Sequence, residues 1–167
     1  MKIEIHGFES VQKRAKTPFQ PRTNLISIGD PDAPPPELTH KPDHILRLVF
    51  DDITLEIFKE RLPDLPERLK NNDELLMKVL PKYNTILFDD KMARQVAEFI
   101  FKFGGETDVL ICQCEYGQSR SAGCAAAIAE YFYGRGVEFF ADDRYYPNKL
   151  VYRKVLRALE ECEEKEI

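Results

Sequence analysis

The stretch from residue 109 to residue 133 constrains the fold of this chain more than any other. It opens with the apolar run Val-Leu-Ile-Cys at 109–112, which predicts a buried strand. Small, alanine-rich residues follow Arg120 and predict a helix. Only six residues, with Gly117 among them, separate the strand from the helix. A tight turn into a helix N-terminus is a ready anion site, because its unpaired amides and the helix dipole both favour negative charge.

Two side chains give this turn a possible chemistry. Cys114 stands at its entrance, where the helix N-terminus favours a thiolate nucleophile at neutral pH. Arg120 lies six residues later and can place two N–H donors on the same anion. Nucleophile, amides and cation together predict attack on phosphorus; the plain alternative is a buried structural cysteine. The residues expected to surround the phosphate are Glu115, Tyr116, Gly117, Gln118, Ser119 and Arg120.

The segment Cys114-Glu-Tyr-Gly-Gln-Ser-Arg120-Ser121 resembles the signature loop of the cysteine-dependent protein tyrosine phosphatases, closest to the dual-specificity branch. The resemblance implies a phosphocysteine intermediate on Cys114, phosphate binding by Arg120 and a Ser121 hydroxyl that eases departure of the thiolate. One residue departs from the pattern. The family usually has a histidine directly before the cysteine, where it helps to order the loop, and this chain has Gln113.

The order of the predicted elements indicates an α/β fold. Strands are expected at 2–7, 24–29 and 44–53, and helical turns at 10–16, from 89 to 103 and from 148 onward. Five prolines make residues 31–42 a loop. This pattern predicts a central, largely parallel (mixed) sheet flanked by helices, with its site beyond the carboxyl ends of the strands. The resemblance, which covers about residues 45–159, implies the phosphotyrosine protein phosphatase-like fold. We expect one domain, 1–167, with a helical insertion at about 54–85.

Breaking a phosphate ester also needs a general acid, which protonates the leaving oxygen. In the dual-specificity relatives this aspartate follows a strand upstream of the cysteine and precedes a helix. That pattern favours Asp52, while Asp51, Asp89 and Asp90 stay as alternatives. Asp89 can also be explained as the N-cap of the next helix. Both acidic pairs follow a phenylalanine, but one ends a strand and the other begins a helix, so we infer no repeat.

Asn148 is the last residue that the resemblance marks. It matches a Pro-Asn near the active site of dual-specificity phosphatases, which implies that its amide helps to position the attacking water, and it is also a good N-cap. Cys112 and Cys124 are either core residues or disulfide partners of an oxidised Cys114.

Composition excludes several other classes. The chain has 43% hydrophobic and 32% charged residues, as an ordinary globular protein does. A net charge of −5 without a basic cluster argues against nucleic-acid binding. No apolar run could span a bilayer, no signal-peptide pattern opens the sequence, and four cysteines suit a reducing cytoplasm. His40 and His44 have no third ligand nearby, so no metal or other cofactor is expected.

Together these features predict a phosphatase that acts on a phosphorylated protein or a small phosphomonoester. The variable loop residues include no lysine, which disfavours a polyphosphorylated lipid. Two alternatives stay open. The first is a phosphate-binding module with weak or no turnover, and the second is thiol redox or sulfur-transfer chemistry on a similar loop.

Overall fold

The computed structural model describes residues 1–166, with side chains through residue 163. Four strands form one sheet in the order β1-β4-β2-β3, namely β1 (Lys2–His6), β4 (Val109–Gln113), β2 (Thr23–Gly29) and β3 (His44–Val49). All three pairings are parallel. The predicted α/β class is therefore confirmed, and the part of the prediction that allowed for a mixed sheet is not needed for residues 1–166.

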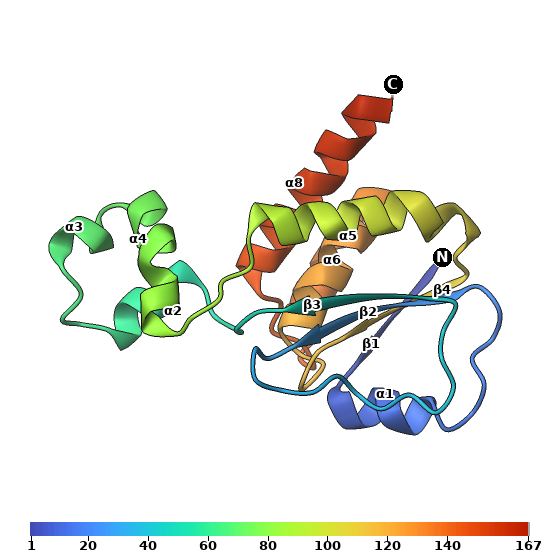
Figure 1. The fold of residues 1–167 in the computed structure, drawn as a ribbon. Coiled ribbons are helices and arrows are strands. Elements are labelled where there is room, and N and C mark those ends of the chain that lie inside the picture. Colours follow the sequence, from blue (N-terminus) through green and yellow to red (C-terminus); the bar gives the residue numbers. More distant parts are fainter. Residues whose placement is uncertain (167) are drawn as a thin grey trace.

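Alternate residues of the strands pack on opposite faces of the sheet. On one face, Leu25 of β2 and Ile111 of β4 pack with Val11 of α1 (Phe8–Arg14). On the other, Ile26 and Leu110 belong to the larger core under α5 (Asp90–Phe103), α6 (Arg120–Tyr133) and α8 (Lys149–Glu166). Figure 1 shows α1 on one side of the sheet and these three helices on the other. The central strands are thus buried on both faces, which explains their continuous apolar runs.

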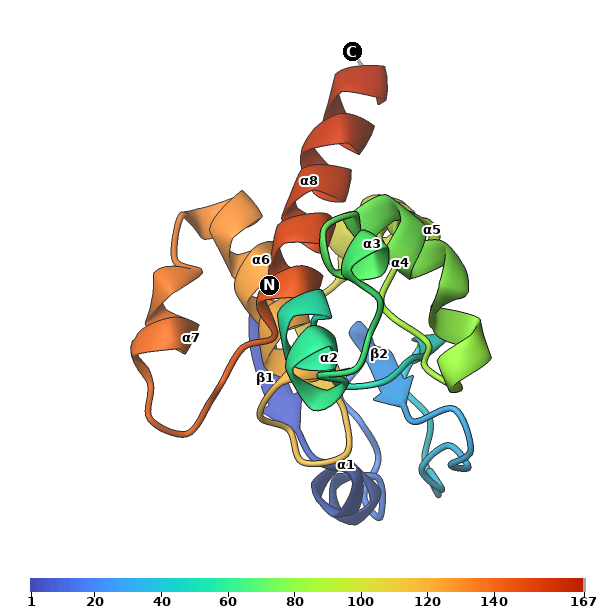
Figure 2. The ribbon, with the colours of Figure 1, turned by 90° about the vertical axis from the view of Figure 1, so that its left-hand side faces the viewer.

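The segment expected as a helical insertion forms a small group of helices beside the sheet. It contains α2 (Leu55–Arg61), α3 (Glu67–Lys70), α4 (Asp73–Val79) and the 3₁₀ turn η1 (Leu80–Tyr83). The group projects to the left in Figure 1, and Figure 2 views it from that side. It has its own apolar core, to which Leu150 of α8 also packs. The members of this core are Ile53, Phe58, Leu65, Leu69, Leu76, Leu80 and Leu87.

The chain enters and leaves this helical group at one place. The Phe50 and Phe88 rings pack with their centroids 4.8 Å apart. Next to them, the Asp51 backbone N–H donates to the carbonyl of Ile86 (2.8 Å), and the Ile86 N–H donates to the Asp51 carboxylate (2.7 Å). Because Asp51 pairs with Ile86, the third strand ends at Val49 rather than at Ile53 as predicted.

Two short elements of the structure were not predicted. A 3₁₀ turn, η2 (Gly104–Glu106), precedes β4, and α7 (Val137–Ala141) follows the break at Gly134. Neither element has the length that apolar periodicity needs to become visible. None of the helices in the described part of the chain is long and apolar enough to cross a membrane.

Candidate active site

The loop between β4 and α6 turns its carbonyl groups outward, where neighbouring segments bind them. The carbonyl of Glu115 accepts from the N–H of Phe8 (2.8 Å), and that of Gln118 accepts from Tyr146 (2.8 Å). The backbone amides of residues 115–119 make no hydrogen bond to any residue that the structure describes. These amides precede the N-terminus of a fourteen-residue helix, α6. The loop therefore offers several free donors to one anion.

Gly117 holds the loop in this shape. Its φ is +67°, a left-handed conformation that other residues adopt only at a cost. A Cβ on this residue would lie 2.6 Å from the backbone nitrogen of Gly7 and 2.7 Å from the carbonyl carbon of His6. The Cys114 N–H also donates to the carbonyl of His6 (3.2 Å). The turn between β1 and α1 thus supports the loop from below and excludes a side chain at 117.

Cys114 lies at the base of the loop, and its side chain is close to the start of α6. Ser121, in the first turn of α6, places its hydroxyl oxygen 3.0 Å from the Cys114 Sγ. Both residues are buried, with exposed fractions of 2% for Cys114 and 0% for Ser121. The Cys114 sulfur therefore has a hydrogen-bonding partner inside the protein.

Arg120 is held in place through one of its terminal nitrogens. Its Nη1 donates to the Asp30 carboxylate (2.7 Å) and to the carbonyl of Phe50 (2.7 Å). The residue is 3% exposed, and its Nε–H is buried with no acceptor among the described residues. An orphaned guanidinium donor in the interior is costly. The position suits an anion that would accept this remaining hydrogen bond.

Asp30 is a site residue that the sequence reasoning missed. It directly follows β2, which pairs with β4, so it lies at the same carboxyl edge of the sheet as the loop. An acidic residue immediately after a central strand was the available signal. Nearby, burial and then the charge of Arg120 lower the pKa of Arg47, and Asp30 partly offsets that repulsion.

Asp52 lies against the loop, and both its contacts come from predicted site residues. Its Oδ1 accepts from the Ser119 hydroxyl (2.7 Å) and from the Asn148 side-chain amide (3.1 Å). The Asn148 side-chain oxygen Oδ1 accepts from the N–H of Leu150 (3.0 Å), so Asn148 also caps α8. A Cβ on Gly123 would lie only 2.5 Å from the backbone carbonyl oxygen of Asn148, so this glycine lets α6 and α8 approach closely.

The three alternative aspartates are occupied elsewhere. Asp51 binds the backbone N–H of Ile86, as described above. Asp89 caps α5 by accepting from the N–H of Met92 (2.8 Å). Asp90, the first residue of α5, accepts hydrogen bonds from the side chains of Lys154 and Arg157 of α8. Among the four candidates, only Asp52 contacts residues of the loop.

Gln113, which stands where the resemblance leads one to expect histidine, supports the loop through a buried chain of hydrogen bonds. Its Nε2 donates to the carbonyl of Cys114 (2.8 Å), and its Oε1 accepts from the Ser27 hydroxyl (2.6 Å). Ser27 in turn accepts from Nη1 of Arg47 (2.8 Å). Gln113 therefore orders the backbone at Cys114 without carrying a charge.

The other residues that the sequence analysis considered lie inside the core or away from the loop. Cys112 and Cys124 are buried and have free thiols. The hydrogen bond with Cys124, followed by burial, raises the pKa of the Cys112 thiol well above its ordinary value. His44 stacks on Phe103, with ring centroids 3.8 Å apart. Within the described part of the chain, no group of three or more His, Cys, Asp or Glu residues could hold a metal ion.

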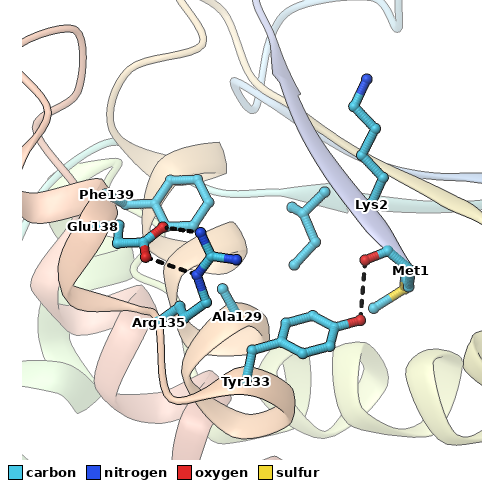
Figure 3. Close-up of a pocket in the computed structure, with 8 residues that line it drawn as sticks. Met1, Lys2, Ala129, Tyr133, Arg135, Glu138 and Phe139 are labelled. Carbon is cyan, nitrogen blue, oxygen red and sulfur yellow. Dashed lines mark hydrogen bonds and ion pairs between the residues drawn. The ribbon is translucent and has the colours of Figure 1, made fainter.

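A cavity of about 260 Å³ lies at the end of the sheet opposite to the loop (Figure 3). It adjoins Met1 and Lys2, at the start of β1, whereas the loop follows the carboxyl end of β4. Its polar groups are already engaged. Arg135 pairs with Glu138, and the Tyr133 hydroxyl donates to the carbonyl of Met1 (3.0 Å). This cavity therefore shows no group that is free for chemistry.

Comparison with known proteins found no matching family model and no matching curated protein.

Proposed function

We propose that this protein is a phosphatase that hydrolyses phosphomonoesters through a phosphocysteine on Cys114. The observation that carries the proposal is the loop, where the free amides of residues 115–119 and the unpaired Nε–H of Arg120 accompany a cysteine. These six hydrogen-bond donors match the oxygens of a phosphoryl group far better than they match a neutral ligand. The fold that we propose is correspondingly that of the cysteine-dependent tyrosine phosphatases.

In the first step the Cys114 thiolate attacks phosphorus. The sulfur–phosphorus bond forms and the bond to the leaving oxygen breaks, while the loop amides and Arg120 stabilise the charge on the phosphoryl oxygens. Asp52 gives its proton to the leaving oxygen. Because its Oδ1 is held by Ser119 and Asn148, its Oδ2 is the oxygen free to carry that proton. The Ser121 hydroxyl, 3.0 Å from the sulfur, stabilises the thiolate.

In the second step water attacks the phosphocysteine. Asp52, now a carboxylate, takes a proton from the water, and Asn148 lies beside it to orient the attack. The sulfur–phosphorus bond breaks, inorganic phosphate leaves and the Cys114 thiolate is restored. We propose phosphotyrosine, and also phosphoserine or phosphothreonine, in proteins as the substrate.

The second candidate function is a phosphate-binding module with weak or no turnover. Gln113 favours it, because a neutral amide hydrogen-bonds the Cys114 carbonyl where a histidine could add positive charge. Both functions predict that the loop binds an oxyanion, but only the first predicts a reactive thiolate.

Hydrolysis of p-nitrophenyl phosphate, with and without vanadate, separates the two functions. The wild type should turn over and be inhibited by vanadate. Cys114→Ser should lose roughly three orders of magnitude or more in kcat, because the hydroxyl does not ionise near neutral pH. Calorimetry should show that this variant still binds inorganic phosphate. Cys162→Ser, at a partly buried position near the end of α8, is the matched control and should keep wild-type kinetics.

Arg120→Lys should be severely impaired as well, since an ammonium group cannot reproduce the guanidinium contacts. A wild type that binds phosphate but releases no p-nitrophenol would favour the binding module. Turnover retained by Cys114→Ser would rule out the phosphocysteine.

A further inference from the structure

A cavity of about 580 Å³ lies directly beside the loop, between the helical group and the start of α8. It shares three residues with the candidate active site, Asp52, Ser119 and Asn148. A phosphorylated residue bound at Cys114 would therefore have its neighbours in the substrate next to this cavity. The volume is enough for a few side chains, which places the cavity in the usual range of ligand sites.

The helical group 54–83 forms one wall of the cavity. Ile53, Thr54 and Ile57 line it from α2 and the residues before it. This wall is fixed, because Ile53 belongs to the core of the helical group and Leu150 of α8 packs against the same core. Tyr146 stands on the other side and is 71% exposed. Apolar side chains therefore line both sides of the cavity.

Two cations line the cavity without an ion pair. Lys149 and Arg153 lie one helical turn apart on α8, and neither forms a salt bridge with any residue whose side chain the structure describes. The Arg153 Nε donates to the carbonyl of Lys149 (3.2 Å), which orients the guanidinium along the helix. By contrast, the next cations of α8, Lys154 and Arg157, both pair with Asp90.

The two acidic residues of the cavity, Asp52 and Glu56, form no ion pair with these cations. Asp52 is held by Ser119 and Asn148. Glu56 lies in the first turn of α2, and hydrogen bonds from its own backbone N–H and from Thr54 are the main reasons why its pKa is lowered, with a smaller effect of Arg153. The Glu56 carboxylate therefore binds groups at the start of its own helix. Lys149 and Arg153 remain able to pair with an anion of a ligand.

We propose that this cavity binds the residues next to the phosphorylated one in an acidic phosphoprotein substrate. The inference depends on the proposed function. A carboxylate of the substrate pairs with Lys149 and Arg153, while an adjoining apolar side chain lies against Ile53 and Ile57. The helical group thereby sets the choice of substrate, because it supplies the wall that faces these cations.

Synthetic phosphotyrosine peptides test this directly. In matched pairs, a single Glu or Gln occupies one position on either side of the phosphotyrosine, and kcat/KM is measured at low ionic strength. At one or more positions the wild type should favour Glu over Gln by roughly three- to tenfold, the range expected for a partly exposed charge pair. The preference should shrink as salt is added.

The double variant Lys149→Glu/Arg153→Glu should abolish or reverse the Glu:Gln ratio. The ratio compares two peptides on one enzyme preparation, so a change in folding does not affect it. Lys91→Glu is the matched control, since Lys91 is exposed on α5 and lies outside the cavity. This variant should keep the wild-type ratio.

Failure of the inference and failure of the proposed function can be told apart. A wild type that hydrolyses p-nitrophenyl phosphate but gives a ratio near one at every position, or prefers Gln, would overturn the acidic subsite alone. If the chain has no turnover, binding of the same peptides to Cys114→Ser, measured by calorimetry, gives the ratio instead. Tighter binding of the Glu peptides would support the subsite, and equal binding would overturn it.

Discussion

Phe-Asp-Asp occurs twice in this chain, at 50–52 and at 88–90, and the two copies lie side by side. Their phenylalanine rings pack 4.8 Å apart, on either side of the point where the helical group begins and ends. Their aspartates differ. In the first copy, Asp52 contacts the loop through Ser119 and Asn148. In the second, Asp89 caps α5 and Asp90 pairs with cations of α8.

The difference follows from what comes before and after each triplet. The first follows β3 at the carboxyl edge of the sheet, where loops from several strands meet. The second precedes a fourteen-residue helix, whose first amides need an acceptor. We therefore expect identical residues to have a chemical role in one place and a structural role in the other.

Asp52→Asn should have the largest effect. Asparagine keeps an oxygen for Ser119 and Asn148 but cannot deliver a proton. We expect kcat for phosphotyrosine to fall by about two orders of magnitude or more, with a much smaller loss for an aryl phosphate whose leaving group is strongly acidic. The high-pH limb of the kcat/KM profile should also flatten.

Asp89→Asn is the matched control and should show no dependence on the leaving group. The comparison requires both variants on both substrates. If Asp89→Asn shows that dependence and Asp52→Asn behaves like the wild type, the acid lies in the second triplet.

Asp51→Ala should act mainly on stability, because it removes the carboxylate that binds the Ile86 N–H. A lost hydrogen bond to a charged acceptor costs about 1–3 kcal/mol, and this one is near solvent, so we expect about 1 kcal/mol in the free energy of unfolding. Denaturant titration measures the loss. Hydrogen exchange should show faster exchange at Ile86 than in the wild type. A leaving-group-dependent loss of kcat in this variant would instead identify Asp51 as the acid.

A smaller effect is expected for Asp90→Asn. Hydrogen bonding to Lys154, the largest cause, and the Arg157 charge lower the pKa of Asp90, although partial burial opposes them. An exposed pair of this kind contributes at most about 1 kcal/mol. Because the pKa is lowered in the folded state, this stability is present above the unfolded value, about 3.9, and is lost as the pH falls through the folded value.

The stability difference between wild type and Asp90→Asn should accordingly be full at pH 7 and shrink below about pH 4. It should also shrink at high salt. For Asp89→Asn we expect only a few tenths of a kcal/mol, because asparagine is an equally good N-cap. A difference that grows as the pH falls would contradict the ion pair of Asp90.

Periodic apolar residues made much of the fold predictable. The buried runs of β2 and β4 and the helical spacing of α5 and α8 are long enough to show in sequence, and Asp89 and Asn148 marked two helix starts. Parallel pairing could be inferred, but the order β1-β4-β2-β3 depends on contacts between distant segments. For the same reason the packing of Phe50 on Phe88 could not be predicted.

The candidate site was predictable where it is continuous in sequence. Residues 114–121 form one turn, whereas Asp30, Ser27 and Arg47 reach it from other strands. The choice between Asp51 and Asp52 also lay beyond the sequence, since neighbouring residues of an extended chain point in opposite directions. We propose Asp52 because it is the one of the two whose side chain binds Ser119.

The phosphoenzyme itself is the most direct test of the central claim, that Cys114 carries the phosphoryl group. Asp52→Asn, mixed with an aryl phosphate that has a good leaving group, should form the intermediate and hydrolyse it slowly. After an acid quench and digestion, mass spectrometry should find one phosphoryl group on Cys114 and none on Cys112 or Cys162. Turnover without phosphate on Cys114, or phosphate on another residue, would contradict the account.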